Sequence, residues 1–163
     1  MSARHVKPDW STINSMGAYY IAKIFLAGSI EQGKAVDWQE SAFEYFKDYD
    51  VEIFNPRRSV WNAELEQNIQ SKEFVRQVTW EQKKLELSDI VLVHFADETL
   101  SPISMHELGL LAKAGKKVVV SCNEKFWRQG NMQISCILNN IPLYNSLGSA
   151  LAHIRVLIEY LKA

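Results

Sequence analysis

Short apolar runs alternate with longer amphipathic stretches along most of the chain. The apolar runs are typical of buried strands, and they fall at 20–27, 51–54, 90–93, 118–120 and 141–144. Between and after them, apolar side chains recur at helical spacing, which predicts helices at 35–49, 72–87, 103–114, 131–139 and 146–162. This order predicts an α/β fold, doubly wound and flavodoxin- or Rossmann-like, with a five-stranded parallel sheet and helices on both faces.

The predicted elements leave two polar stretches without a clear period. Residues 1–19 are interpreted as a flexible or loosely docked N-terminal arm, and 59–71 as a lid or a short helix. The 163-residue length fits one domain with a real core, so 20–163 is predicted to fold as a single unit.

Composition narrows the class of protein. Hydrophobic residues make up 47% of the chain and charged residues 23%, which is typical of a globular domain. The net charge of −1 gives no reason to expect duplex nucleic acid or an anionic membrane as partner. No apolar run reaches the roughly 18 residues of a membrane-spanning helix, and the first residues lack the apolar segment of a signal peptide. We therefore expect a cytoplasmic protein.

The two cysteines carry no recognisable chemistry. Cys122 and Cys136 form neither a C-x-x-C pair nor a zinc-binding pattern, so we expect buried, reduced thiols. No metal site and no cofactor are predicted.

The segment 88–121 is the centre of the predicted sheet. It reads as a strand, a polar loop, a helix and a second strand, and in parallel sheets ligands bind beyond the carboxyl ends of the strands. Glu107 lies early in that helix, where it can face a ligand. Ser104 and Glu107 also match the S-x-x-E capping box, a structural device that needs no substrate. Both interpretations stay open on the pattern alone.

Two further loops follow predicted strands. Gly28 and Ser29 end the first strand, where free amides and a hydroxyl can hold a phosphate or a sugar, although a plain strand-to-helix turn explains them equally well. After the second strand, Asn55 precedes Arg57 and Arg58. These arginines are either a bidentate grip on an anion or a solvated basic turn.

Five motifs in order resemble the nucleoside 2-deoxyribosyltransferase-like family, which includes nucleoside and nucleotide N-glycoside hydrolases. The resemblance covers about residues 21–145. Its motifs are I-F-L-A-G-S-I at 24–30, N-P-R-R at 55–58, Q-V-T-W-E at 77–81, S-D-I-V-L-V at 88–93 and S-P-I-S-M-H-E-L-G at 101–109.

The resemblance implies an enzyme with Glu107 as its nucleophile. In the family the glutamate before L-G attacks the anomeric carbon and forms a glycosyl-enzyme, which water or a second base then resolves. A second acidic residue of the family falls on Glu81, where the usual residue is aspartate. Asp97, in the loop after the strand, is a secondary candidate for contact with the substrate.

The resemblance also implies where a substrate is bound. The phosphate-binding serines of the nucleotide hydrolases correspond to Ser29, Ser101 and, from a neighbouring subunit, Ser135; Asn131 opens the same N-M-Q-I-S segment and is a further candidate. Two positions depart from those hydrolases, because their basic loop residue is Glu31 here and their tyrosine is Phe25. A 5′-phosphate on the substrate is therefore less strongly implied than the glycosidic chemistry.

Three hypotheses follow. The first is cleavage of the N-glycosidic bond of a nucleoside or nucleotide, by hydrolysis or base transfer, in a homodimer or larger homo-oligomer. The second is a nucleotide-binding sensor or interaction module without turnover. The third is cleavage of the nicotinamide bond of an NAD-type substrate. The sequence leaves open the base, the sugar, the phosphate and the choice between hydrolysis and transfer.

Overall fold

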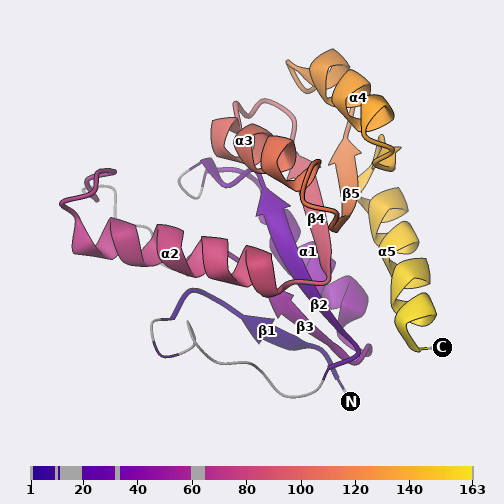
Figure 1. The fold of residues 1–163 in the computed structure, drawn as a ribbon, viewed down its shortest axis with the longest axis horizontal. Helices are drawn as coiled ribbons and strands as arrows, with labels where there is room; N and C mark the ends of the chain where they lie inside the picture. Colours follow the sequence, from indigo (N-terminus) through magenta and orange to yellow (C-terminus); the bar gives the residue numbers. More distant parts are fainter. Residues whose placement is uncertain (1, 10, 12–19, 32–33, 60–64, 163) are drawn as a thin grey trace.

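The fold is an α/β sandwich around one parallel sheet (Figure 1). The computed structural model describes residues 2–9, 11, 20–31, 34–59 and 65–162. Six strands are hydrogen-bonded in the order β1-β3-β2-β4-β5-β6, all parallel. They are β1 Arg4–Val6, β2 Ala22–Gly28, β3 Val51–Phe54, β4 Ile90–Phe95, β5 Lys117–Cys122 and β6 Leu143–Tyr144.

Five helices cover the sheet on both faces, as the pattern predicts. They are α1 Trp38–Phe46, α2 Lys72–Leu87, α3 Pro102–Leu111, α4 Gln129–Leu138 and α5 Leu147–Lys162. Successive strand residues point to opposite faces, so the strands contribute to two separate cores. Buried residues of α2, α3 and α4 pack on one face and those of α1 and α5 on the other. Figure 1 shows α2 and α3 in front of the strands and α1 behind them.

The five strands other than β1 follow the flavodoxin order. From β2 the chain winds outward through α1 to β3, then crosses back through α2 to β4 and continues through α3 to β5. β2 and β4 are therefore neighbours at the point where the winding direction reverses. Ligands of open parallel sheets bind at such a point, beyond the carboxyl ends of the two strands.

The sheet has six strands because part of the predicted arm adds one at its edge. β1 pairs with β3 over Arg4 to Val6, and the side chain of Val6 is buried. Arg4 also pairs with the buried Glu52 carboxylate at 3.4 Å. A strand of three residues is too short to show a period, which is why the pattern suggested only five strands. Residues 12–19 of the arm lie outside the described part of the chain.

The long helices match their predicted ranges most closely. α2 spans the predicted residues, and it begins where the Ser71 hydroxyl accepts a hydrogen bond from the Phe74 amide at 3.3 Å. The predicted strand at 141–144 is shorter, since only Leu143 and Tyr144 pair with β5. In the 59–71 segment, 65–71 form turns and irregular backbone, and 60–64 lie outside the described residues.

Candidate active site

Gly28 closes β2 against the end of β4 at the reversal point. Its backbone has φ 147°, and a Cβ there would come within 2.3 Å of the His94 carbonyl oxygen and 2.8 Å of the Trp38 ring. No larger side chain fits without moving the backbone of β4. Gly28 therefore allows the close approach of the loops that follow β2 and β4, and its role here is one of backbone packing.

Three hydroxyl groups form a closed, buried cluster just beyond Gly28. Ser29 Oγ lies 2.8 Å from Thr99 Oγ1 and 2.5 Å from Ser101 Oγ, and the last two are 2.9 Å apart. The Ala96 amide also donates to Ser29 Oγ at 3.0 Å. The two predicted binding serines, Ser29 and Ser101, are thus brought together, and Thr99 joins them.

Glu31 lies over this cluster. Its Oε1 accepts hydrogen bonds from the backbone amides of Leu100 at 3.0 Å and Ser101 at 2.9 Å. These amides precede α3, whose first turn leaves backbone donors without helical partners. The carboxylate is therefore favoured both by the two hydrogen bonds and by the positive end of the helix dipole.

Of the two interpretations of Ser104 and Glu107 that the sequence left open, the capping box is wrong. α3 begins with Pro102, Ser101 is its N-cap, and no acidic residue lies in its first turn. Proline is well suited to the first helical position because its φ is already helical and it has no amide hydrogen to satisfy. Ser104 is consequently inside the helix, and Glu107 is released from any capping role.

Glu107 instead lies on the buried face of α3. Its side chain is 6% exposed, and Ser104, one turn earlier on the same face, is 5% exposed. Within the described part of the chain, the Glu107 carboxylate makes no hydrogen bond and no ion pair. Burying an ionised carboxylate without a cation costs free energy. Either a proton neutralises Glu107, or its buried charge serves a chemical function.

A second buried carboxylate acts on Glu107. Burial, and after it the negative charge of Glu81, raise the pKa of Glu107 to about 8. Burial likewise raises the pKa of Glu81, while its hydrogen bond from Gln77 and the positive charge of Arg58 oppose that rise. Two nearby carboxyl groups in one low-dielectric site cannot both ionise easily, so at neutral pH they hold a proton between them.

Gln77 fixes Glu81 from one helical turn earlier on α2. Its amide nitrogen donates to Glu81 Oε1 and, at 3.2 Å, to the Pro56 carbonyl oxygen. Its amide oxygen accepts from Arg58 Nε at 2.6 Å. A continuous chain of hydrogen bonds therefore links Arg58, through Gln77, to the acidic pair.

Arg57 and Asn55 hold the backbone together. The guanidinium of Arg57 donates to the carbonyl oxygens of Ala35 at 2.8 Å and Val36 at 3.3 Å, and it lies 3.6 Å from Asp37. Asn55 is buried and accepts from the Arg57 amide at 2.9 Å. These contacts give Asn55 and Arg57 a structural role in holding the backbone. Arg58, by contrast, is connected to Glu81 through Gln77.

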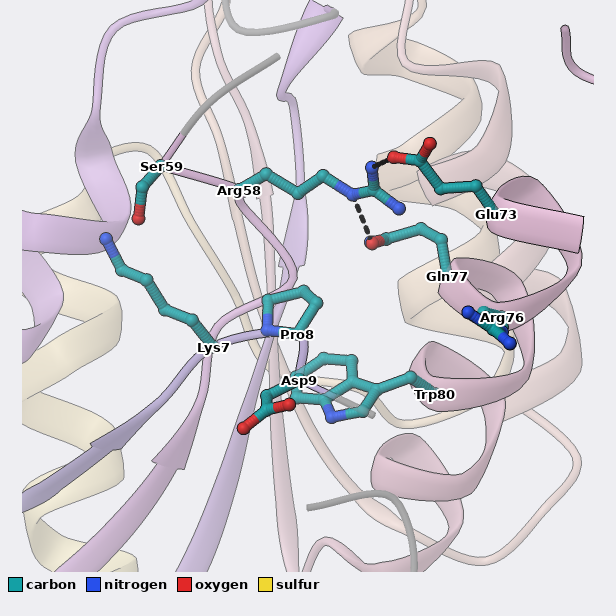
Figure 2. A pocket seen from close by; sticks show the side chains of 9 residues that line it. All are labelled: Lys7, Pro8, Asp9, Arg58, Ser59, Glu73, Arg76, Gln77 and Trp80. Atoms are coloured by element: carbon teal, nitrogen blue, oxygen red, sulfur yellow. Dashed lines mark hydrogen bonds and ion pairs between the residues drawn. The ribbon is translucent and has the colours of Figure 1, made fainter. Parts of the chain in front are cut away.

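A cavity of about 410 Å³ lies on the far side of Arg58 (Figure 2). Its wall combines residues after β1, residues after β3 and one side of α2, among them Lys7, Arg58 and Arg76. Arg58 Nη1 pairs with Glu73 Oε1 at 2.5 Å across it. Neither Glu81 nor Glu107 is among the described residues that line this cavity, whereas Gln77, which bonds to Glu81, is one of them.

Asp97 lies beyond β4, on the side of His94 and Cys122. One of its carboxylate oxygens is buried and has no hydrogen-bond partner among the described residues. Burial lowers the pKa of His94 to about 4, and the charge of Asp97 opposes that change. The neutral His94 ring bonds to Ser121 Oγ at 3.0 Å. Asp97 is therefore coupled to His94, and its charge is not among the causes of the raised pKa values of Glu81 and Glu107.

The two candidates on α4 are not part of this group of residues. Asn131 is exposed, and Ser135 lines a groove of about 140 Å³ between α4 and the side of α3 that carries Gly109 and Ala112. Glu107 faces away from that groove. Within one chain, these two side chains do not join the acidic pair.

Sequence reasoning missed three residues of the site. Gln77 is the polar residue one turn before Glu81, a spacing that would have suggested a contact. Thr99 gave no signal, because its partners lie across the loops after β2 and β4. At Glu31 the sequence showed only a departure from the basic loop residue of the hydrolases, since a carboxylate that reaches the Leu100 amide 69 residues along the chain has no local signature.

No group of three or more His, Cys, Asp or Glu side chains in the described part of the chain is arranged to hold a metal ion. None of the described helices is long and apolar enough to cross a membrane.

The family model described as "Nucleoside 2-deoxyribosyltransferase like" matches residues 21–126. No curated protein matches the chain. Among solved structures, the chain is similar to the "Crystal structure of conserved protein from Enterococcus faecalis V583", with 12% identity and a TM-score of 0.47, covering 86% of this chain and 97% of the other.

Proposed function

Because the chain belongs to the nucleoside 2-deoxyribosyltransferase-like family, we propose that it cleaves the N-glycosidic bond of a nucleoside or nucleotide through a glycosyl-enzyme on Glu107. The observation that carries the proposal is the pair of buried carboxyl groups, Glu107 on α3 and Glu81 on α2, beside the reversal point of the sheet. Two carboxyl groups whose surroundings favour one shared proton can divide the roles of nucleophile and acid.

In the protonation state that reacts, Glu107 is ionised and Glu81 carries the shared proton. The ionised Glu107 oxygen then bonds to the anomeric carbon as the carbon–nitrogen bond to the base breaks. The bonding electrons leave with the base, and the proton of Glu81 neutralises the departing nitrogen. In the second step water, or the nitrogen of another base, attacks the anomeric carbon and releases Glu107. A water nucleophile gives its proton to Glu81, so both carboxyl groups return to their starting state.

The other polar residues support these steps. Gln77 holds Glu81 by a hydrogen bond and is itself held by Arg58. The cluster of Ser29, Thr99 and Ser101 fixes the loops at the start of α3, the helix that carries Glu107. The chemistry proposed here uses only side chains of the protein.

We also propose that two or more copies of the chain associate. Large apolar side chains on the outer surfaces of α3 and α4 are exposed, which is unusual for a protein that stays monomeric. They are Ile103, Leu110, Ile134, Ile137 and Leu138. In such an assembly Asn131 and Ser135 of α4 can reach the site of a neighbouring copy.

The proposal is tested by chromatographic assay for free base over nucleosides, nucleotides and NAD, using the wild type and Glu107→Gln. We expect the wild type to release base from at least one compound, and Glu107→Gln to be slower by roughly 10³-fold or more. Turnover by Glu107→Gln at the wild-type rate contradicts the assignment.

A binding module without turnover is the second candidate. The observation in its favour is the raised pKa of Glu107, about 8, which leaves the carboxyl group mostly protonated and weakly nucleophilic at neutral pH. Thermal-shift measurements over the same compounds separate the two functions. Stabilisation by a compound from which no base is released, at pH 7 and at pH 9, favours the binding module.

A further inference from the structure

The cavity beside Arg58 has a wall in which basic side chains outnumber acidic ones. The described charged residues that line it are Lys7, Arg58, Arg76, Asp9 and Glu73. The Glu73 carboxylate is paired with Arg58, and the carboxylate of the exposed Asp9 accepts hydrogen bonds from Ser11. Both acidic groups therefore already have partners, and the wall as a whole attracts an anion.

Arg58 presents unused hydrogen-bond donors to this cavity, although its side chain is only 18% exposed. A guanidinium carries five N–H donors in a planar fork. Arg58 Nε donates to Gln77 and Nη1 pairs with Glu73, whereas Nη2 has no partner among the described residues (Figure 2). A carboxylate or phosphate is the group that such an edge of a guanidinium binds most strongly.

Lys7 brings a second positive charge to the cavity from the N-terminal arm. β1 ends at Val6, which pairs with Phe54 at the end of β3, so the residues after the two strands meet at the same edge of the sheet. The Lys7 amine makes no hydrogen bond and no ion pair with the described residues, and Figure 2 shows it reaching toward Ser59. The short strand β1 thus places a cation in the same wall as Arg58.

The cavity is larger than an inorganic anion needs. Its volume of about 410 Å³ lies in the range of sites for small organic molecules, about 300–1,000 Å³. A water molecule takes up about 30 Å³ in the liquid, so an ion a few times that size leaves most of the cavity empty. Pro8 and Trp80 supply an apolar part of the wall, against which a flat ring can pack.

We propose that this cavity is a binding site for an organic oxyanion, a phosphate or carboxylate group carried on a ring. Arg58 and Lys7 hold the anionic group, and the ring packs against Trp80. The site is distinct from the acidic pair in the residues that form it, and its ligand is recognised by charge at one end and by apolar contact at the other.

Gln77 connects this site to the proposed chemistry. It lines the cavity, accepts from Arg58 and donates to Glu81. The Arg58–Glu73 pair is partly exposed, and exposed ion pairs are weak, so a bound anion can draw the guanidinium toward itself. The hydrogen bond from Arg58 to Gln77 then weakens, which changes how Glu81 is held.

Phenyl phosphate is the probe for this site, because it joins an oxyanion to a flat ring, and phenol is its uncharged counterpart. Calorimetric titration compares the wild type with the double variant Lys7→Gln, Arg76→Gln. Arg58 stays in place because it also holds Gln77. The matched control is Lys125→Gln, Arg155→Gln, which removes the same charge at exposed positions that do not line the cavity.

We expect the wild type to bind phenyl phosphate at least about tenfold more tightly than phenol. The cavity variant should lose about tenfold or more in affinity for phenyl phosphate, and the control about twofold at most. A wild type that does not bind phenyl phosphate, or equal losses in the two double variants, overturns the inference. If the cavity variant has a lowered Tm, Lys7→Gln alone repeats the comparison. Binding is measured without turnover, so this result does not depend on the glycosidase function.

Base release then identifies where the oxyanion comes from. If phenyl phosphate raises KM at unchanged kcat, the site takes an anionic part of the substrate. If it changes kcat at unchanged KM, the site takes a separate molecule that acts through Gln77. Either effect should disappear in the Lys7→Gln, Arg76→Gln variant, and an effect that persists there shows binding elsewhere and overturns the link to this cavity.

Discussion

The unpaired carboxyl group of Glu107 should make the stability of the fold depend on pH. Its pKa is about 8 in the folded chain, against an ordinary value of 4.5. Between these values the folded chain keeps a proton that the unfolded chain releases, so the free energy of unfolding falls as pH rises from about 4.5 to 8.

Glu107→Gln removes this loss of stability at high pH, because glutamine does not ionise. We expect the variant to be more stable than the wild type by up to roughly 5 kcal/mol at pH 9, and by far less at pH 5. Urea unfolding at the two pH values measures the difference. A stability difference that is the same at pH 5 and pH 9 would show that Glu107 is ionised normally in the fold.

Glu81 should control the ionisation of its partner. Its negative charge is the second cause of the raised Glu107 pKa, after burial. In Glu81→Gln we therefore expect the rising limb of the pH–rate profile to move to lower pH. The maximal rate should fall by about 10²–10⁴-fold, since the acid that assists the leaving base is lost. A reduced rate with an unmoved limb would indicate that the two carboxyl groups do not interact.

At the scale of elements, β1 should contribute to stability although it has only three residues. Val6 is 5% exposed and packs in the core beneath α2, and the Asn55 amide donates to its carbonyl oxygen at 2.9 Å. Val6→Asp buries a charge, so we expect it to lower the free energy of unfolding by roughly 3 kcal/mol or more.

Val36→Asp is the matched control for this prediction. It makes the same substitution at a side chain that is 80% exposed, so it should change stability by no more than about 0.5 kcal/mol. Denaturant unfolding of both variants gives the comparison. Equally small changes in the free energy of unfolding for Val6→Asp and Val36→Asp would mean that β1 adds nothing to the core.

The elements also explain what the sequence could and could not predict. α2 was predictable because sixteen residues carry its period and Ser71 marks its start. β1 was not, because three residues carry no period. The start of α3 was predicted to within one residue, at 103 instead of Pro102, but the S-x-x-E pattern misleadingly suggested a cap at Ser104. Local patterns therefore predicted the long elements and missed the short strand.

For the candidate site, the pattern and the family resemblance pointed to the two carboxylates, but the contacts between distant segments could not be foreseen. Gln77 bridges Arg58 and Glu81 through side-chain conformations that no spacing specifies. Glu31 reaches across to the loop after β4, where it accepts hydrogen bonds from the Leu100 and Ser101 amides. The sequence showed only that position 31 departs from the basic residue of the hydrolases, and these two hydrogen bonds came only from the fold.

At the scale of the whole molecule, the outer surface of α3 and α4 should be an interface. Ile137 is 73% exposed and Leu138 75% exposed, next to each other at the end of α4. We expect a homodimer or larger assembly in size-exclusion chromatography with light scattering, and a shift toward monomer in Ile137→Glu. Tyr160→Glu, at an 80% exposed position on α5, should leave the mass unchanged. A monomeric wild type would contradict this expectation.

The glycosyl-enzyme on Glu107 is the central claim, and mass spectrometry of protein quenched during turnover tests it most directly. We expect an adduct with the mass of one sugar residue, mapping to the peptide that contains Glu107 and absent from Glu107→Gln. An adduct on a different residue, or its persistence in Glu107→Gln, would contradict the account.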